Sequence, residues 1–565
     1  MVHRRLLTVL AIGGVMAGAS AMGGAAGPAT QPLTRQQAAQ KLLDKDGLQM
    51  TAPARLALQM VARGDLQLQS ADLKGNSSVA QQAQRTRQLQ GGNQESGEGL
   101  SNVLVNNPGE DVHQVDQTTQ SETTIAVSGQ NVVVGFNDSQ TALLAYTAAA
   151  DLTGYSWSND GGRSFHDGNQ LPNPPGEQNL GDPALGSDRA GNFYYSNLTN
   201  NIDPITGALG IGVAKSTNGG RTFSATKRIE PAVGATTLYT GDKDALTVGR
   251  DPGAASRDNV YVAWDDFVID FTSGFVVTNG LPVAHSYDGG ATYQVVYANR
   301  LVQSNFDCSS SQYIGADPVV DPRNGTLYVA AEKIARTWDC SFPPPPFSFS
   351  QVVFKSTDGG LTFGPETLIS GVTSSSPTGV FKLGEHQFMR NLEFPSLAVD
   401  PAGIIYDTWN DGRSGNSHIL IAKSSDTGIT WGAPISVTTG TNDEMQPALS
   451  ADGSGLHDLY YMRNADNTLD VVVARSTNGG VSWSYKRVTS QSFPGVFNLP
   501  QFDPVIASTY MGDYIANVSH GGSQYYAWGD NRNIVTNFLW PQGRHDPDVF
   551  LAKQGQDSND GGGGN

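Results

Sequence analysis

The sequence is poor in cysteine and in positive charge. Its 565 residues include two cysteines, and 35 lysines and arginines stand against 53 aspartates and glutamates, which gives a formal net charge of −18. The basic residues form no cluster along the chain. Proteins that bind nucleic acid or anionic membrane surfaces carry a basic patch or stripe, so the composition excludes both kinds of partner.

A long, strongly apolar run is also absent from the N-terminus. The chain begins with MVHRR, continues with a stretch rich in Gly, Ala and Ser from Leu6, and then reads Ala19-Ser20-Ala21. A membrane anchor needs about 20 strongly apolar residues, whereas this order is typical of a signal peptide with a small-residue cleavage site. No cysteine follows that site, which argues against a lipoprotein. We predict a signal peptide over residues 1–21 and a secreted, extracellular or periplasmic protein, with a membrane anchor as the alternative.

Residues 22–101 differ in composition from the rest of the chain. They are rich in Gln and Ala, and TRQQAAQKLLDKD from Thr34 and TAPARLALQMVARGD from Thr51 have helical spacing. The polar stretch after Asn76 has the composition of a flexible linker. We predict a partly helical segment that acts as a spacer, with a pro-region or cell-wall tether as the alternative. The Gly-rich end, 556–565, is predicted to be disordered.

One short pattern, Ser-x-Asp/Asn-x-Gly-x-Ser/Thr-aromatic, occurs six times. The copies, called boxes below, are SNDGGRSF from Ser158, STNGGRTF from Ser216, SYDGGATY from Ser286, STDGGLTF from Ser356, SSDTGITW from Ser424 and STNGGVSW from Ser476. Their starts lie 52 to 70 residues apart, which matches a four-stranded sheet with its loops and is too long for a helical repeat unit. The chain is therefore predicted to be a repeat protein built from small sheets.

Each box has the residues of a hairpin turn. The Asp or Asn can accept hydrogen bonds from turn N–H groups, and Gly adopts the positive φ that closes two strands. Box five has Thr427 in place of the first glycine and keeps Gly428, so the second glycine is predicted to be the stricter requirement. We expect the closing aromatic to point between neighbouring sheets, and we assign the boxes a structural role.

A second repeat lies upstream of the boxes and occurs seven times. An acidic residue, often a Pro, opens a short apolar run, which leads through Gly or Asn into a strand rich in Tyr, Val and Trp. The copies begin at Glu122, Asp182, Asp242, Asp317, Glu393, Glu444 and Gly512. Only one further strand, DVFLAK from Asp548, follows the last copy, and NVLVNN from Asn102 could complete its sheet. We therefore predict an all-β fold, a β-propeller over 102–555 with seven blades, and six blades as the alternative.

The boxes resemble Asp boxes of the sialidase superfamily. The region from about Gln120 to Lys553 is similar to secreted bacterial BNR-repeat proteins described as exo-α-sialidase-like. Such a resemblance implies a propeller in which three arginines hold the substrate carboxylate, an Asp is the acid/base and a Tyr activated by a Glu is the nucleophile. The first of those arginines lies in a Phe/Tyr-Arg-Ile-Pro motif ahead of the first box. This chain lacks the motif, so no catalytic residue is carried over by motif.

Position in the repeats supplies candidate catalytic residues instead. The starts of the first strands converge on the central channel at the face opposite the boxes, and the second strands end at that face. A ring of carboxylates is expected there, with perturbed pKa values. The catalytic candidates are Asp182, Asp317, Glu393, Asp513 and Tyr510. As the alternative, these groups cap backbone N–H groups or hold water and calcium.

Two second strands end in the same pattern, Trp-x-Asp-x-Arg. These pairs are Asp411 with Arg413 and Asp530 with Arg532, and Arg390 precedes the fifth first strand. Three arginines at one face could hold a carboxylate by bidentate hydrogen bonds, so these five residues are the substrate-binding candidates. The alternative is that Trp409 and Trp528 pack between blades and each Arg pairs with its neighbouring Asp.

The two cysteines are predicted to form a disulfide. Cys308 precedes the first strand of the fourth blade and Cys340 follows its second strand, so both fall on the same face of one blade. A disulfide there suits an exported protein. A catalytic or metal-binding cysteine pair is the alternative, although no His or Cys cluster lies nearby.

These patterns favour a secreted carbohydrate-active propeller. The leading hypothesis is a glycoside hydrolase, sialidase-like, that acts on an acidic or otherwise decorated glycan. A non-enzymatic propeller that binds glycan or protein at the same face is the alternative. We expect a monomer with a glycan or glycoconjugate as its partner and no membrane insertion. No cofactor is required, and the carboxylate ring could hold a Ca²⁺ ion.

Overall fold

The computed structural model describes most of the chain between residues 99 and 555. The described residues are 36, 37, 40, 99–110, 119–139, 151–201, 209–230, 237–270, 276–304, 308–376, 379–384, 387–497, 511–535 and 542–555. Residues 36, 37 and 40 are helical, and η2 (Pro108–Glu110) is a single 3-10 turn. Everything else in the described ranges is strand or loop, so the predicted all-β class is confirmed. The predicted signal peptide and the Gly-rich tail lie outside these residues, and no helix within them is long and apolar enough to cross a membrane.

The described residues contain seven antiparallel units, each of four strands, that follow one another along the chain. Unit one consists of β2 (Gln120–Ser128), β3 (Asn131–Asp138), β4 (Thr153–Ser158) and β5 (His166–Gln170). Unit two consists of β7 (Ala184–Ser187), β8 (Phe193–Asn201), β9 (Leu209–Ser216) and β10 (Lys227–Arg228). Unit three consists of β11 (Thr237–Arg250), β12 (Asp258–Asp270), β13 (Val276–Ser286) and β14 (Gln294–Ser304). Unit four consists of β15 (Ser310–Val320), β16 (Leu327–Arg336), β17 (Ser348–Ser356) and β18 (Thr367–Val372). A single parallel pair, Thr240 with Leu209, joins units two and three into one nine-stranded sheet.

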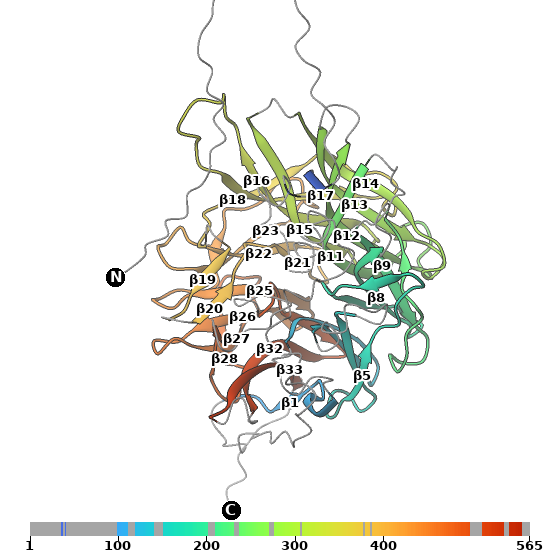
Figure 1. The fold of residues 1–565 in the computed structure, drawn as a ribbon, viewed down its shortest axis with the longest axis vertical. Helices are drawn as coiled ribbons and strands as arrows, with labels where there is room; N and C mark the ends of the chain where they lie inside the picture. Colours follow the sequence, from blue (N-terminus) through green and yellow to red (C-terminus); the bar gives the residue numbers. More distant parts are fainter. Residues whose placement is uncertain are drawn as a thin grey trace, which may run out of the picture.

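The last three units complete the series. Unit five consists of β21 (Ser396–Val399), β22 (Ile405–Asp411), β23 (His418–Ser424) and β24 (Ile435–Ser436). Unit six consists of β25 (Glu444–Asp452), β26 (Gly455–Arg463), β27 (Thr468–Ser476) and β28 (Ser484–Arg487). Unit seven is β31 (Ala516–His520), β32 (Ser523–Val535), β33 (Arg544–Gly555) and, from the other end of the chain, β1 (Asn102–Leu104). β1 lies beside β33 (Figure 1), with Asn102 opposite Ala552 and Leu104 opposite Phe550.

Five short strands of the described residues lie outside this series. β6 (Glu177–Asn179) extends β8, β29 (Phe493–Pro494) extends β27, and β19 (Val380–Lys382), β20 (Gln387–Arg390) and β30 (Val496–Phe497) form a three-stranded sheet. β20 and β30 come from segments more than 100 residues apart, and their pairing brings the chain before unit five next to the chain before unit seven.

Apolar clusters fill the gaps between neighbouring units. Val132 and Tyr525 share a cluster between units one and seven, and Val133 and Tyr195 share one between units one and two. Corresponding clusters lie between each other pair of successive units. The box aromatics pack on six of these clusters; they are Phe165, Phe223, Tyr293, Phe363, Trp431 and Trp483. Burial of these faces therefore joins unit to unit.

The first strands of the units contact one another in chain order. β2 contacts β7, β7 contacts β11, and so on through β15, β21, β25 and β31, which in turn contacts β2. Many of these strands contain a bulge that includes a residue with a positive φ, as at Glu122 (52°), Lys243 (43°) and Gln446 (52°). Unit four has Gly315 (68°) at this place, where a Cβ atom would lie 2.3 Å from Phe394 Cδ1. Side chains forced into this backbone region cluster at functional sites.

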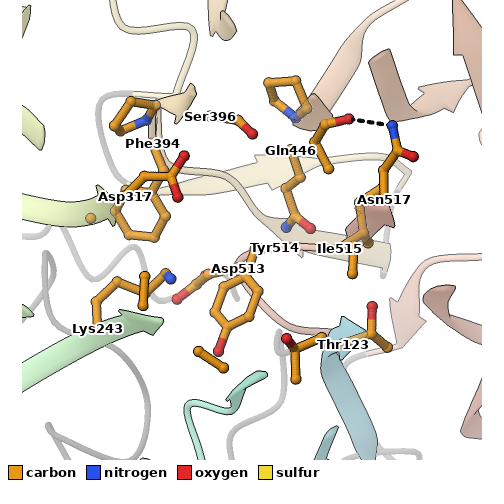
Figure 2. Close-up of a pocket in the computed structure, with 18 of the residues that line it drawn as sticks. Thr123, Lys243, Asp317, Phe394, Ser396, Gln446, Asp513, Tyr514, Ile515 and Asn517 are labelled. Atoms are coloured by element: carbon orange, nitrogen blue, oxygen red, sulfur yellow. Dashed lines mark hydrogen bonds between the residues drawn. The ribbon is translucent and has the colours of Figure 1, made fainter. Parts of the chain in front are cut away.

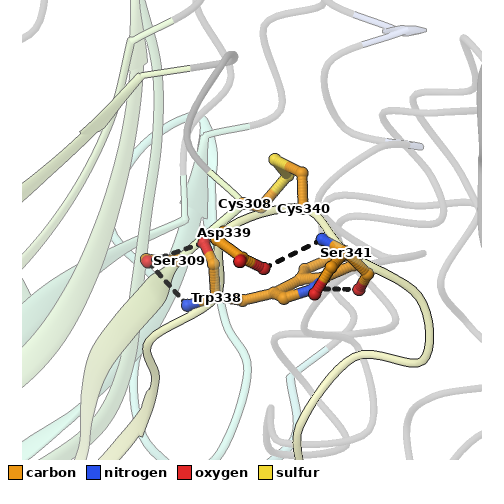
Figure 3. Close-up of a disulfide and its surroundings, with 6 residues drawn as sticks. All are labelled: Cys308, Ser309, Trp338, Asp339, Cys340 and Ser341. Atoms are coloured by element: carbon orange, nitrogen blue, oxygen red, sulfur yellow. Dashed lines mark hydrogen bonds between the residues drawn. A yellow bond between two sulfur atoms is a disulfide. The ribbon is translucent and has the colours of Figure 1, made fainter.

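The predicted disulfide between Cys308 and Cys340 is confirmed. The two Cα atoms are 5.3 Å apart, and the bond joins the segment before β15 to the loop after β16 (Figure 3). Trp338 N donates to Ser309 Oγ at 2.9 Å, which holds the two segments together beside the bond. Unit four thus carries a covalently fastened loop at the end where its first strand begins.

Candidate functional site

A cavity of about 230 Å³ is lined by residues on or next to the first strands of all seven units. Figure 2 shows side chains from several units around it. Its polar and aromatic lining residues include Thr123, Lys243, Asp317, Phe394, Ser396, Gln446, Asp513, Tyr514 and Asn517. The bulged strands described above supply much of this lining, so the repeat itself builds the cavity.

Lys243 and Asp317 are the charged groups on one side of the cavity. Lys243 Nζ lies 3.9 Å from the centroid of the Tyr514 ring and 5.8 Å from that of Phe394. Asp317 is half-buried, and its Oδ2 accepts a hydrogen bond of 2.5 Å from Leu397 N. Burial raises the pKa of Asp317 to about 6, while the hydrogen bond from Leu397 and the charge of Lys243 act in the opposite direction. The cavity therefore holds a carboxyl group that is partly protonated near neutral pH.

Asp513, a second predicted catalytic residue, is bound to Arg390. Arg390 Nε and Nη2 lie 2.6 and 3.0 Å from the two carboxylate oxygens of Asp513, and both side chains are buried. Asp513 N donates to Glu122 Oε1 at 3.1 Å. Gln446 Nε2 donates to the carbonyl oxygens of Arg390 and Gly512, at 2.9 and 2.8 Å. Asp513 and Arg390 thus neutralise each other inside the wall of the cavity.

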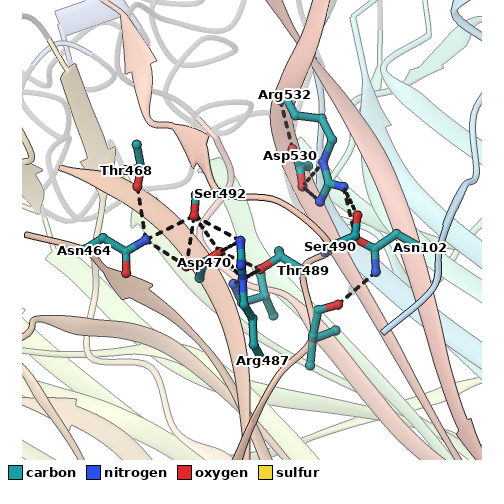
Figure 4. Close-up of polar contacts among 12 residues, drawn as sticks. Asn102, Asn464, Thr468, Asp470, Arg487, Thr489, Ser490, Ser492, Asp530 and Arg532 are labelled. Atoms are coloured by element: carbon teal, nitrogen blue, oxygen red, sulfur yellow. Dashed lines mark hydrogen bonds and ion pairs between the residues drawn. The ribbon is translucent and has the colours of Figure 1, made fainter. Parts of the chain in front are cut away.

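The other two predicted arginines pair with the Asp two positions earlier. Arg413 Nε and Nη2 donate to Asp411 at 2.8 and 2.7 Å. Arg532 Nε donates to Asp530 Oδ2 at 2.9 Å, and its Nη1 donates to Asn102 Oδ1 and Ser490 Oγ at 3.1 and 2.9 Å (Figure 4). This is the arrangement that the alternative interpretation predicted.

The tryptophans of the two patterns complete the same arrangement. Trp409 and Trp528 are fully buried, and each indole Nε1 donates to the Asp two positions later, at 3.1 and 2.9 Å. The Trp-x-Asp-x-Arg pattern therefore places a carboxylate between an indole N–H and a guanidinium. Hydrogen bonds from Arg413 and the other neighbours hold the pKa of Asp411 below its usual value although burial alone would raise it.

Two further predicted catalytic residues, Glu393 and Asp182, are not among the residues that line the cavity. Glu393 is buried, and its Oε1 accepts hydrogen bonds from Ser374 Oγ, Ser375 N and Ser375 Oγ at 3.0, 2.8 and 3.2 Å. Burial raises the pKa of Glu393 to about 7. Asp182 is fully buried with a φ of 54°, and its N–H donates to Asn137 Oδ1 at 2.7 Å. Tyr510 lies outside the described residues.

Two further carboxyl groups, Asp265 on β12 and Glu332 on β16, are buried. Burial raises the pKa values of Asp265 and Glu332 well above their usual range, with nearby Asp242 and Glu393 acting in the same direction. In the described part of the chain, no three Asp, Glu, His or Cys side chains are grouped as a metal site requires. The calcium ion remains a prediction.

Lys243, Gln446 and Tyr514 were missed by the sequence reasoning, which considered acidic residues and arginines. A signal was present. Lys243 and Gln446 occupy the positive-φ position of their repeats, the place that Glu122 has in unit one, and Tyr514 follows the acidic residue that opens the seventh repeat. Alignment of the repeats on that position would have selected the first two.

The comparisons with known proteins show general likenesses. No family model matches the chain, and no curated protein matches it. Among solved structures, the chain is similar to the phage phi92 endosialidase (TM-score 0.41, 11% identity, 82% of this chain and 70% of that one). It is also similar to the Trypanosoma rangeli sialidase in complex with sialic acid (0.39, 12%, 82% and 74%). A third is the α-L-arabinofuranosidase of Fusarium graminearum with arabinobiose (0.36, 12%, 80% and 98%). These scores are too low for the likeness to carry an argument about this chain.

Proposed function

We propose that the seven units form one closed, seven-bladed propeller and that its central cavity binds a saccharide outside the cell. Three observations support the closed ring: the first strands contact one another in order with β31 against β2, apolar clusters lie between successive units, and β1 completes unit seven. These contacts favour seven blades over six. The disulfide suits an oxidising compartment.

The chemistry of the cavity is the observation that carries the binding proposal. Tyr514 and Phe394 present aromatic rings, Gln446 and Asn517 present amides, and Asp317 presents a carboxyl group, all around one cavity. A sugar offers apolar C–H faces and hydroxyl groups that both donate and accept. A few placed polar groups among apolar and aromatic ones are the usual composition of a small-molecule site.

The geometry favours binding over sialidase-type cleavage. Each predicted clamp arginine already donates two hydrogen bonds to an aspartate, and the partners Asp411, Asp513 and Asp530 are all buried. Recruiting such an arginine to a substrate carboxylate would leave a buried Asp without its partner, at a cost of about 3–5 kcal/mol per pair. We therefore place the binding propeller ahead of the sialidase-like hydrolase.

Glycoside hydrolysis is the second candidate because of Asp317. Its pKa of about 6 leaves a fraction of the carboxyl group protonated at neutral pH, which suits a general acid that donates a proton to a leaving oxygen. The second carboxylate of the cavity, Asp513, has both oxygens bound by Arg390. Water would have to be activated by another group.

Calorimetric titration with a panel of mono- and oligosaccharides tests the binding proposal. We expect at least one ligand to bind, and Tyr514→Ala to weaken it about tenfold or more because the ring lines the cavity. Tyr485→Ala is the matched control, since Tyr485 is exposed on β28 and its hydroxyl donates to Val437 O. Equal affinities for the two variants would contradict the proposal.

A panel of aryl glycosides and sialosides tests the second candidate. If the chain is a hydrolase, Asp317→Asn should lower kcat by two orders of magnitude or more with little change in KM. If wild type and Asp317→Asn both bind saccharide and neither releases the aryl group, the binding proposal is kept and the hydrolase candidate is rejected.

A further inference from the structure

Arg336, the last residue of β16, has aromatic neighbours instead of an acidic one. Its guanidinium carbon lies 5.1 Å from the centroid of the Trp338 ring and 4.5 Å from that of Phe347. Its Nε is buried and has no hydrogen-bond partner, and among the described residues no carboxylate pairs with it. Arg390, Arg413 and Arg532 differ, because each is neutralised by an aspartate.

The loop that carries these rings is fastened at its base and exposed at its tip. The disulfide and the hydrogen bonds between Ser309 and Trp338 fix the base, and the indole Nε1 of Trp338 donates to Ser341 O (Figure 3). Beyond it, the Phe342 and Phe347 residues are 83% and 42% exposed. An exposed aromatic on a fastened loop loses little conformational entropy when a ligand covers it.

The strand β15 connects this loop to the cavity. Arg336 pairs with Ser310 at the start of β15, and Asp317, further along β15, lines the cavity. Ser310 and Asp317 are seven positions apart, which corresponds to at most about 23 Å of strand because a bulge lies between them. A ligand that contacted both places would have to be a chain of several sugar units.

We propose that Arg336, Trp338 and Phe347, with the exposed ring of Phe342, form a second saccharide subsite that takes a sugar carrying a carboxylate. This inference rests on the proposed function, because the same glycan would extend from the cavity to the loop. The aromatic rings hold the guanidinium plane in place, and a guanidinium donates two parallel hydrogen bonds to a carboxylate. Phe342 offers an apolar face to the sugar ring.

The overall charge of the chain makes a local positive group necessary for an acidic sugar to bind. The chain carries a formal net charge of −18, so its overall field repels an acidic glycan. A guanidinium without an acidic partner is then the local attraction that such a ligand requires. A neutral glycan would use the aromatic rings and gain nothing from Arg336.

The test measures calorimetric affinities of the full chain for acidic oligosaccharides and for their neutral methyl esters. One arm uses oligogalacturonate and the other a sialylated oligosaccharide, since a uronic acid and a sialic acid share the carboxylate. We expect one acid to bind more tightly than its ester, and Arg336→Ala to weaken the acid about tenfold or more while leaving the ester unchanged. Arg163→Ala, an exposed arginine in box one whose Nη1 donates to Asp160 O, is the matched control.

The outcomes separate this subsite from the cavity. If Tyr514→Ala weakens binding while Arg336→Ala behaves like Arg163→Ala, the subsite is refuted and the cavity stands. Equal affinities for acid and ester in both arms also refute it. If no saccharide binds the wild-type chain, both proposals fail. Loss of acid preference in Arg336→Ala with retained affinity for the ester supports the subsite, and Arg336→Lys should restore only part of it because an ammonium cannot form the paired bonds.

Discussion

Replacement of Asp358 in box four should destabilise the protein without disturbing the cavity. The Asp358 carboxylate accepts hydrogen bonds from Ser356 Oγ (2.8 Å), Leu361 N (3.1 Å), Thr362 N (3.0 Å) and Thr362 Oγ1 (2.5 Å). In Asp358→Ala the two turn N–H groups would lose this acceptor and be left to water. By analogy with the side chains that cap helices, we expect the free energy of unfolding to fall by about 1–2 kcal/mol. In a domain of this size that corresponds to about 2 °C in Tm.

The chain supplies the control for this experiment. Boxes two and six have Asn in place of Asp, and there Asn218 Oδ1 accepts from Thr222 N at 3.1 Å while its Nδ2 donates to Thr222 Oγ1 at 2.8 Å. Asp358→Asn should therefore keep most of the stability that Asp358→Ala loses. Urea and thermal unfolding of the three proteins measure the difference. An alanine variant as stable as wild type, or an asparagine variant as unstable as alanine, would refute the reasoning.

Three further predictions concern stability. Loss of the disulfide in a Cys308→Ser, Cys340→Ser double variant should cost about 2–4 kcal/mol in urea unfolding, since the bond closes a loop with a sequence separation of 32; no change on reduction would contradict this. Gly315→Ala should cost about 1–3 kcal/mol because φ is 68° and the new Cβ would meet Phe394, whereas Gly371→Ala, with open space around it, should cost less than about 1 kcal/mol. Burial raises the pKa values of Asp244 and Asp458 to about 7; because the folded protein favours their protonated form, Tm should fall as the pH rises from 5 to 8, and an unchanged or rising Tm would contradict the assignment.

The repeat signals of the fold could be read from the sequence because they are local. A turn box needs a small side chain with a hydroxyl group, an Asp or Asn and a glycine within five residues, and the sequence contains that pattern six times. The pairing of Asn102 to Leu104 with β33 was also predictable, since the last unit lacked a strand and the first strand lacked a partner. A count of the strands in each unit shows that the last unit is one strand short, and an unpaired edge of this kind needs a partner.

The site could be predicted only as a location. Acidic residues at the strand starts were expected to gather at one face, and Asp317 and Asp513 do line one cavity. An arginine can bind a ligand only if no other side chain of the protein already pairs with it. The sequence alone does not give the distances between side chains that decide this. In Trp-x-Asp-x-Arg the Asp lies between both neighbours, so a pattern that suggested a clamp produces an internal salt bridge.

The sequence reasoning missed three residues that line the cavity. Lys243, Gln446 and Tyr514 differ in chemistry, so a search by residue type cannot group them. Lys243 and Gln446 share a positive φ at the bulges of their strands, which the identity of a non-glycine residue does not reveal. Tyr514 lies outside that pattern, just before β31. Contacts across units, such as Lys243 with Tyr514, join residues 271 positions apart in the sequence.

The pairing of β1 with β33 sets the order in which this molecule can be completed. Asn106 Nδ2 donates to Asp548 Oδ1 at 2.7 Å across a sequence separation of 442 residues. The last sheet therefore cannot form until nearly the whole chain has been synthesised. Until then β1 is an unpaired edge, open to pairing with another chain. A slow final docking step should therefore limit the folding rate, and a peptide that mimics residues 102–107 should compete with it by occupying the edge of β33.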